Sequence, residues 1–458
     1  MLPKEDNELI TNVNAGAPMG ELFRRFWLPV ALAEELPGPD CEPVRVKVLN
    51  EDLIAFRDTH GNPGLLDAYC PHRGAPMFFG RNEDDGLRCV YHGWKFDVDG
   101  KCVDVPNAPE GETFKHKIKI KYYPCVEAGD LIFAYMGPPE KKPPFPEFEW
   151  TRLPKAHRYV TKFLVECNYL QAMEGDFDPG HGPFLHTKMD GTPQRPQFNV
   201  QVRAQSRPTP PDEPFPFAVG PRRQTEADKQ AWGTVEDTVS GLFFIQSRER
   251  PDGTKVAAVA PWMMPIYCTA GTTAGTNTYS TNMRIPIDNQ NIYFYRLRWS
   301  YNPIPEDEIE EYKHGGWYYP PLIPGTYRGV QNVHNDYQID RNVQKNFTYS
   351  GIPCFPWQDV AMMENQWGPI ADRTQEHLTS SDFQIIAVRR RLLKAAKALA
   401  EGIEPEAAQH PEAYAYHRAS FVSQTGTLDE TIAKARELAS RSELPVAEAP
   451  KIEVAIRV

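Results

Sequence analysis

The chain has 458 residues, of which 41% are hydrophobic, and a formal net charge of -11. This length is sufficient for two or three domains with substantial cores, and the ordinary apolar content excludes a largely disordered chain. An acidic chain lacks the concentrated basic face that phosphate binding needs, which argues against a nucleic-acid partner. Residues 1–7 lack the apolar run of a secretory signal, and the most apolar stretch, 256–267, is short and contains two prolines. We therefore expect a cytoplasmic protein without a membrane partner.

A small all-β domain is expected near the N-terminus, over residues 43–145, after a helical or extended segment at 1–42. Its strands are predicted from alternating apolar residues, and Asp99-Gly100 is the dipeptide typical of a tight hairpin. A proline-dense polar stretch at 138–144 indicates the domain boundary. The clearest expected strands are 44–49, 52–56, 94–98 and 101–105.

Two Cys-His pairs interrupt this β pattern. Cys70 and His72 form the first pair, and Cys89 and His92 form the second after sixteen intervening residues. Two thiolates can hold one iron of a [2Fe-2S] cluster while two neutral imidazoles hold the other, which raises the reduction potential above that of an all-Cys cluster. We therefore expect the chain to transfer single electrons.

A structural zinc site is the alternative, because two Cys and two His also make a tetrahedral cage. Zinc modules usually pair Cys with Cys and His with His, whereas this site alternates them. Gly74 and Gly93 follow the two pairs, and small residues there let backbone N–H groups approach bridging sulfides, which favours iron-sulfur. The remaining cysteines are scattered and are expected to be buried apolar residues: Cys41, Cys102, Cys125, Cys167, Cys268 and Cys354.

A larger α+β domain is expected over residues 146–458. Residues 380–400 predict the clearest helix, with Thr379 or Ser380 as its cap and Gly402 after its end. Residues 206–230 hold six prolines and predict a long loop or insertion. Further expected elements are the strand segments 233–247, 273–284 and 291–299 and a helix at 428–441.

A second chemical site is indicated by His181 and His186. Histidines five apart do not share a face of a regular helix, but Gly182 and Pro183 break that regularity, so both rings could turn toward one metal. Two histidines and a carboxylate with open positions form the facial triad of non-haem Fe(II) oxygenases. Asp178 lies three residues before His181, although an Asp before Pro179 is also a normal helix start.

These motifs together resemble the catalytic α subunit of a Rieske non-haem iron oxygenase, and within that family the phthalate 4,5-dioxygenase and aromatic O-demethylase group. The resemblance extends over nearly the full length of the chain. It implies an N-terminal all-β Rieske domain, followed by a catalytic domain with an antiparallel sheet flanked by helices. The segments that carry it are 20–29, 70–74, 89–94, 178–186, 333–341 and 368–374.

The resemblance also implies cofactors and roles for single residues. A [2Fe-2S] Rieske cluster would be bound by the two Cys-His pairs, and a mononuclear Fe(II) by His181, His186 and a downstream carboxylate. That carboxylate falls on Asp359, with Glu364 and Asp372 as competing positions and a helix cap as a competing role for Asp359. Asp178 would bridge the cluster of one subunit to the iron of the next, in a head-to-tail homotrimer.

The implied reaction uses O2 and electrons from NADH. A separate reductase, with or without a ferredoxin, would deliver them, since the chain shows no glycine-rich dinucleotide fingerprint after a strand. The related enzymes oxidise aromatic acids, and we favour O-demethylation or mono-oxygenation over cis-dihydroxylation. A Rieske electron carrier and a zinc-stabilised binding protein are more distant alternatives. Arg207 and Arg248 are candidates for holding a substrate carboxylate, although a single arginine is more often a surface charge.

Overall fold

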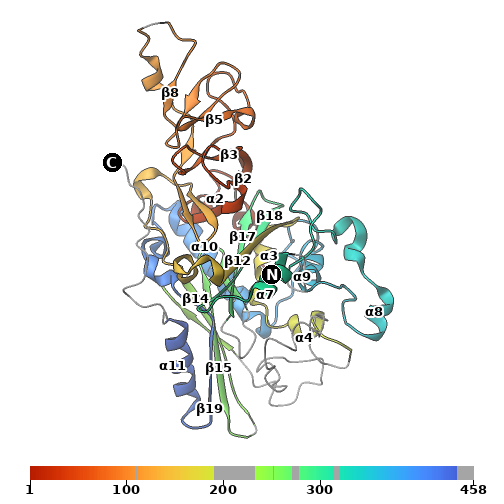
Figure 1. Cartoon of the computed structure of the whole chain (residues 1–458). Helices are drawn as coiled ribbons and strands as arrows, with labels where there is room; N and C mark the ends of the chain where they lie inside the picture. The colour runs from red at the N-terminus through yellow and green to blue at the C-terminus, as the bar shows by residue number, and fades with distance from the viewer. Residues whose placement is uncertain (110, 190–232, 251, 271–277, 314–318, 441–458) are drawn as a thin grey trace.

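The computed structural model describes residues 1–109, 111–189, 233–250, 252–270, 278–313 and 319–440. A small lobe stands at one end of the molecule, and a larger lobe holds a wide sheet with helices on both sides (Figure 1). The small lobe contains β2 (Val44–Val48), β3 (Glu51–Arg57), β5 (Arg81–Glu83) and β8 (Cys102–Asp104). This arrangement confirms the predicted α+β fold. Within the described residues, no helix has the length and apolar content needed to cross a bilayer. The boundaries at 42/43 and 145/146 stay predictions.

The N-terminal segment folds onto the large lobe. Helices α1 (Lys4–Thr11) and α2 (Pro18–Arg24) pack against α10 (Phe383–Ala400), and β1 (Trp27–Leu32) follows them. All six residues of β1 are buried, because it pairs with β11 (Leu131–Tyr135), which pairs in turn with β10 (Cys125–Ala128). This three-stranded sheet joins the two ends of the segment that contains the small lobe.

The small lobe consists of two four-stranded antiparallel sheets around its own core. The predicted hairpin at Asp99-Gly100 is present, with strands shorter than expected and a bulge between them. Its core is made by residues such as Phe56, Leu87 and Phe96. The strands are β2 (Val44–Val48), β3 (Glu51–Arg57), β4 (Pro63–Asp67) and β9 (Tyr122–Tyr123), and β5 (Arg81–Glu83), β6 (Gly86–Arg88), β7 (Lys95–Phe96) and β8 (Cys102–Asp104).

An eight-stranded antiparallel sheet organises the large lobe, in the order β12-β18-β17-β16-β15-β14-β13, with β19 paired to β15. The segment expected at 233–247 is a hairpin of two strands, and the apolar stretch at 256–267 contributes two strands that the sequence analysis did not assign. The strands are β12 (Arg158–Val165), β13 (Gly233–Asp237), β14 (Gly241–Glu249), β15 (Lys255–Met263), β16 (Tyr267–Ala270), β17 (Thr278–Pro286), β18 (Ile292–Ser300) and β19 (Ala419–Ser423).

Helices cover both faces of this sheet. On one face Phe243 and Ile245 of β14 pack against α11, and on the other Phe244 contacts Phe177 at the end of α3, with 5.5 Å between ring centroids. Alternation along the strand therefore assigns one face to α11 and the other to the helices of the candidate metal site. The helices are α3 (Tyr169–Phe177), α4 (Gly182–Leu185), α7 (Glu306–Lys313), α8 (Arg341–Asn346), α9 (Phe355–Met363), α10 (Phe383–Ala400) and α11 (Leu428–Ala439).

The two predicted C-terminal helices are present, but each is shorter than predicted by two or three residues at one end. Thr379 accepts a hydrogen bond from the Ser381 backbone N–H and caps a single 3-10 turn, so the regular helix α10 begins only at Phe383. Gly402 follows that helix with φ of +88°, a conformation that glycine adopts without strain. The expected insertion at 206–230 lies outside the described residues. Of the six remaining cysteines, Cys41 and Cys125 are only half-buried, contrary to expectation.

Candidate metal centres

The two Cys-His pairs lie on two loops of the same shape in the small lobe. In each loop the cysteine N–H donates to the residue five positions later, and the cysteine carbonyl accepts from the glycine four positions later. Gly74 and Gly93, the two glycines concerned, have φ of +70° and +82°, a region that other residues rarely adopt. A Cβ on Gly93 would also lie 2.5 Å from Pro106. The glycines are therefore required by the turns themselves.

These loops bring the four predicted ligand side chains together. Cys70 and Cys89 are buried, while the rings of His72 and His92 lie 4.4 Å apart and nearer the surface. Burial raises the pKa of the Cys70 thiol to about 11. The Nδ1 atom of His72 is buried without a hydrogen-bond partner, and Trp94 stacks on the same ring at 4.3 Å. Two inner sulfurs and two outer nitrogens fit the asymmetric ligation of a mixed Cys/His [2Fe-2S] cluster.

The second group of ligand atoms forms where α4 meets α9. Donor atoms of His181, His186 and Asp359 all lie within 4.8 Å of one another. Asp359 Oδ1 is 3.4 Å from His181 Nε2 and 3.1 Å from His186 Nε2. One carboxylate oxygen and two imidazole nitrogens thus converge on one point, and His186 Nε2 is buried with no hydrogen-bond partner of its own. This donor set suits Fe(II) with open positions.

The other nitrogen of each imidazole faces a second acceptor. His186 Nδ1 lies 2.7 Å from Gln358 Oε1, and Gln358 in turn donates to the Ile352 carbonyl at 2.8 Å. Because an amide oxygen can only accept, the His186 proton belongs on Nδ1, which leaves Nε2 for a metal. His181 Nδ1 lies 3.5 Å from Asp178 Oδ2. The two rings are therefore oriented before any metal binds.

Electrostatics at this centre follow from the carboxylates. Burial alone would lower the pKa of His181, but Asp178 and Asp359 raise the pKa to about 9. Burial would likewise raise the pKa of Asp359, yet His186 and His181 hold that pKa below its ordinary value. Two carboxylates thus place negative charge beside both imidazoles, and this charge suits a divalent cation.

Asp178 ends a helix rather than starting one. It is the C-cap residue of α3, and its Oδ1 accepts from the Gly180 backbone N–H at 2.6 Å. The competing interpretation as a helix start before Pro179 was therefore wrong. The Asp178 side chain is about a quarter exposed, so one carboxylate oxygen can serve His181 while the group remains reachable from outside.

The three candidate carboxylates downstream have different surroundings. Asp359 lies inside α9 and faces the histidines, so it is not a helix cap. Glu364 follows α9, where it accepts from the Glu166 backbone N–H and from the Tyr337 hydroxyl. Asp372 accepts from Thr374 and Gln375 in a half-buried turn. The geometry therefore favours Asp359 over its two competitors.

Several supporting residues were not identified from the sequence. Gln358 is one of them, and only its position next to Asp359 could have indicated it. Gln171 on α3 donates to the Met363 carbonyl of α9 at 2.6 Å, and buried Glu174 pairs with Arg373 and Arg389. These contacts hold α3, α9 and α10 together beneath the candidate metal site. They join residues about 200 positions apart, so no local sequence motif could predict them.

Of the two candidate substrate arginines, the structure describes one. Arg207 lies outside the described residues. Arg248 lies near the end of β14, where alternation places it on the same face as Phe244 and hence on the side of α3. Arg248 lies four positions after Phe244, which corresponds to about 13 Å along a strand. Arg248 therefore lies on the sheet face that looks toward the metal site, but away from its centre.

Comparison with known proteins agrees with both halves of this picture. The family described as "Rieske [2Fe-2S] domain" matches residues 26–124, and "LigXa C-terminal domain like" matches 134–210 and 258–442. The chain is 36% identical over 409 residues to the phthalate 4,5-dioxygenase oxygenase subunit of Pseudomonas putida, covering 88% of each chain. It is 29% identical over 411 residues to the 5,5'-dehydrodivanillate O-demethylase oxygenase subunit of a Sphingobium species, covering 89% of this chain and 83% of the relative.

Solved structures share the fold. Dicamba monooxygenase bound to dicamba superposes with a TM-score of 0.55 at 18% identity, covering 82% of this chain and 98% of that structure. The fold and the two donor sets define a protein that links an iron-sulfur electron carrier to a mononuclear non-haem iron. The chain belongs to the Rieske non-haem iron oxygenases, as the oxygenase subunit of a multicomponent system. A [2Fe-2S] cluster and a mononuclear iron are its cofactors, so the zinc alternative is wrong.

Proposed function

We propose that Cys70 and Cys89 hold one iron of the cluster and that His72 and His92 hold the other. We further propose His181, His186 and Asp359 as the ligands of the mononuclear iron. The observation that carries the second assignment is the convergence of both Nε2 atoms on Asp359 Oδ1, while the histidine Nδ1 atoms face Gln358 and Asp178. When bound, these groups supply single electrons and activation of O2.

The chain's own residues then have definite tasks. Gln358 fixes the His186 tautomer by accepting its Nδ1 proton, and Phe355 stacks on the same ring at 4.0 Å, which prevents rotation. Asp178 lies 3.5 Å from His181 Nδ1 on one side, within ion-pair distance, and would accept from a cluster histidine of a neighbouring subunit on the other. The protein thereby orients the ligands and leaves iron positions open for O2 and substrate.

A head-to-tail homotrimer is supported by two exposed apolar sets. The cluster loops stand in the small lobe, away from α4 and α9 in the same chain (Figure 1). Large apolar side chains that are more than half exposed surround the cluster loops, and others surround α4, α8 and α9, so one set can pack on the other in a second copy. The first set is Tyr69, Phe79, Val90 and Tyr91, and the second is Phe184, Phe347 and Trp367.

The substrate we propose is an aromatic acid, oxidised with electrons that come from NADH through a reductase. The relatives named above act on phthalate and dehydrodivanillate, and a third, 30% identical over 444 residues, is the 3-chlorobenzoate-3,4-dioxygenase oxygenase subunit of Comamonas testosteroni. Arg248 would supply the counter-charge for a carboxylate. We favour O-demethylation or mono-oxygenation, with cis-dihydroxylation as the second candidate because the most identical of these three relatives is named a dioxygenase.

A product assay tests this proposal. The purified chain is incubated with a reductase, NADH, O2 and a panel of phthalates, benzoates and methoxybenzoates. Formaldehyde release marks O-demethylation and a cis-diol marks dioxygenation. If neither appears although the cluster is reduced during the assay, the aromatic-acid proposal is wrong.

A further inference from the structure

A row of lysines runs along the edge of the small lobe beside the candidate cluster. From Lys115 to Lys121 every second residue is a lysine, the residues between them are His116, Ile118 and Ile120, and the segment contains no acid. Ile118 and Ile120 are buried in the lobe's core, so alternation turns the lysines between and beside them outward. We call these residues the lysine strip: Lys115, Lys117, Lys119 and Lys121.

The strip reverses the charge of the molecule locally. The chain has 61 acidic and 50 basic residues, yet four of the seven residues from Lys115 to Lys121 are lysines. Lys121 is paired with Glu51. In the part of the chain that the structure describes, Lys117 and Lys119 are exposed and have no ion pair. Their charges therefore face solvent, where they can act on an approaching protein.

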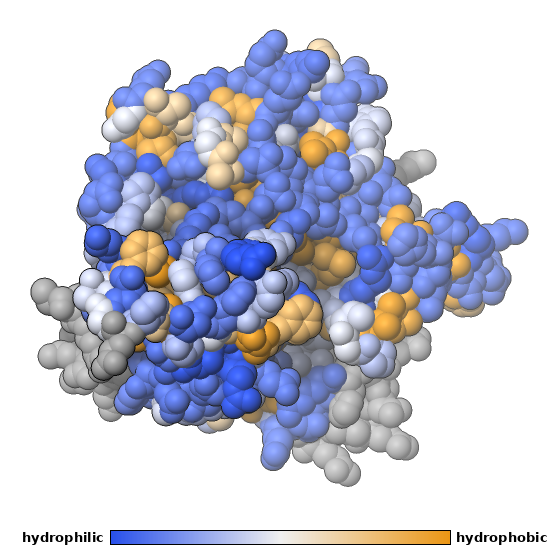
Figure 2. Space-filling model, turned by 90° about the horizontal axis from the view of Figure 1, so that it is seen from above, coloured by the Kyte–Doolittle hydropathy of each residue, from blue (hydrophilic) through white to orange (hydrophobic). Residues whose placement is uncertain are grey.

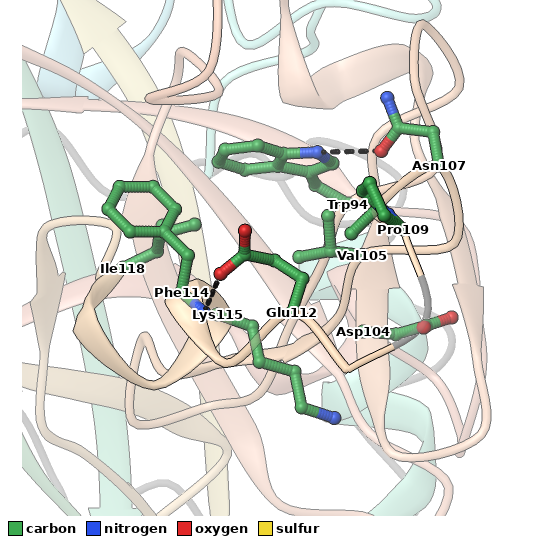
Figure 3. A pocket seen from close by; sticks show the side chains of 10 residues that line it. Trp94, Asp104, Val105, Asn107, Pro109, Glu112, Phe114, Lys115 and Ile118 are labelled. Carbon is green, nitrogen blue, oxygen red and sulfur yellow. Dashed lines mark hydrogen bonds between the residues drawn. The ribbon is translucent and has the colours of Figure 1, made fainter.

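The strip adjoins the cluster through one pocket. Figure 3 shows this pocket, of about 310 Å³, with Lys115 and Phe114 on one side and Trp94 on the other. The Trp94 indole donates to Asn107, and its ring stacks on His72 with an interplanar angle of 10°. A protein seated over the pocket would thus be one aromatic ring away from a proposed cluster ligand. Asp104 and Glu112 also line the pocket, but Asp104 is paired with Arg88 and Glu112 accepts from the Phe114 backbone.

We propose that the lysine strip and the Trp94 pocket form the docking surface for the electron-donor protein, and that the donor presents acidic side chains around its own redox centre. The proposal rests on the proposed function, because it needs a cluster held by His72. The docked donor gives up one electron, which reduces one of the two ferric irons, and no bond is made or broken. A membrane or nucleic acid would need a larger basic surface than four lysines on a chain of charge -11.

Charge complementarity explains why such a strip would be useful. Electrostatic attraction raises association rates between proteins by about 10- to 1000-fold and loses its effect as salt increases. Figure 2 views the molecule from the end where the small lobe stands, and this face is largely hydrophilic with scattered apolar patches. On such a face, charged side chains can orient an incoming partner.

The test compares two charge-matched double variants of the full holoprotein. Lys117→Glu/Lys119→Glu alters the strip, and Lys155→Glu/Lys394→Glu makes the same charge change at exposed positions of the large lobe. The probe is a reduced plant-type [2Fe-2S] ferredoxin, which is an acidic protein, and the readout is the stopped-flow rate of cluster reduction. We expect the strip variant to be reduced about tenfold more slowly at low salt, and to match the wild type at high salt. The control should stay near the wild-type rate.

The outcomes separate this inference from the proposed function. A missing Rieske electron paramagnetic resonance signal in the wild type would refute the cluster assignment, whereas a normal signal and normal reduction by dithionite in every variant would leave it intact. With the cluster intact, equal rates for the strip variant and the wild type, or equal losses in both variants, would overturn the docking proposal. A change of oligomeric mass in the strip variant alone would also overturn it, because the strip would then belong to a subunit interface.

Discussion

Single atoms decide what the candidate iron site can do. His181 and His186 each direct Nε2 toward Asp359. The Nδ1 atom of His186 faces Gln358, and the Nδ1 atom of His181 faces Asp178. Asp178 is about a quarter exposed, as is His181, and it ends α3 instead of lying within it. The chemistry of the site thus depends on two acceptors, Asp178 and Gln358, that would not themselves bind the metal.

Asp178→Asn should separate metal binding from electron delivery. Asparagine keeps the shape and can still accept from Gly180, but it loses the charge that would bridge two centres. We expect normal iron and sulfide content with turnover reduced by about 100-fold. Iron analysis and product formation check this, with Asp372→Asn, in a turn away from the two histidines, as the control. Unchanged turnover would remove the bridging role.

Gln358→Leu should weaken the iron site alone. Leucine fills a similar volume but removes the acceptor of His186 Nδ1, so the ring loses its fixed tautomer. We expect iron affinity to fall about 10- to 100-fold while the cluster signal stays normal. Iron titration of the apoprotein measures the first and electron paramagnetic resonance the second. Wild-type iron affinity would contradict the role given to Gln358.

Helices α3 and α9 form the frame of the site at the level of elements. The C-terminal end of α3 leads into the loop and short helix that carry the two histidines, while α9 carries Asp359 and Gln358. Gly175 of α3 lies so close to Met363 that a Cβ would be 2.2 Å from its terminal methyl group. Close packing of these two helices, with Glu174 paired to two arginines beneath them, fixes the distance between ligands that are far apart in sequence.

Glu174→Gln should destabilise this frame in a pH-dependent way. Burial would raise the pKa of Glu174, but Arg373 and Arg389 hold it below its ordinary value of 4.5. The folded pKa is depressed, so the stabilisation is complete above about pH 4.5 and disappears as the pH falls through the folded pKa. We expect the variant to lose about 3–5 kcal/mol at neutral pH, because two buried guanidinium groups lose their anion.

Thermal unfolding of wild type and variant between pH 3 and pH 7 measures this difference. The gap between the two should narrow toward low pH. Glu8→Gln is the matched control, since Glu8 forms an exposed pair with Lys4 on α1. A constant gap across the pH range would show that the destabilisation does not come from the charge of Glu174.

The arrangement of the whole molecule raises the question of how electrons reach the iron. The two candidate centres lie in different lobes of one chain (Figure 1). Exposed apolar side chains surround both. A closed ring of copies would place the cluster of one subunit beside the iron of the next. The lysine strip would then remain for the donor, so each lobe surface would have its own partner.

Mixed trimers should show this directly. A Cys89→Ser chain lacks a complete cluster and a His181→Ala chain lacks a complete iron site, so each alone should be inactive. Co-expressed in equal amounts, they should regain a measurable fraction of wild-type turnover, because some interfaces pair an intact cluster with an intact iron. Native mass spectrometry confirms mixing. Mixed trimers without activity would mean that electrons stay within one chain.

The sequence by itself was sufficient for the family, the fold class and the kinds of cofactor. These depend on local spacing: Cys70 to His72, Cys89 to His92 and His181 to His186 each lie within one loop or short turn, and glycines in left-handed turns shape the cluster loops. Strands β12 and β19 were not predicted, although β12 is rich in strand-forming residues such as Tyr159, Val160 and Phe163. The short strand β19 has fewer such residues, and its pairing with β15 stabilises it.

Only the tertiary structure could bring Asp359 to the histidines and show that Glu364 and Asp372 bond elsewhere. The reason is physical: a carboxylate can be a ligand, a cap or an ion-pair partner, and the groups that choose between these roles come from distant segments. The same holds for Gln358, for Glu174 and for the lysine strip. The strip's sequence is plain in the chain, but its position beside Trp94 and His72 exists only in the folded molecule.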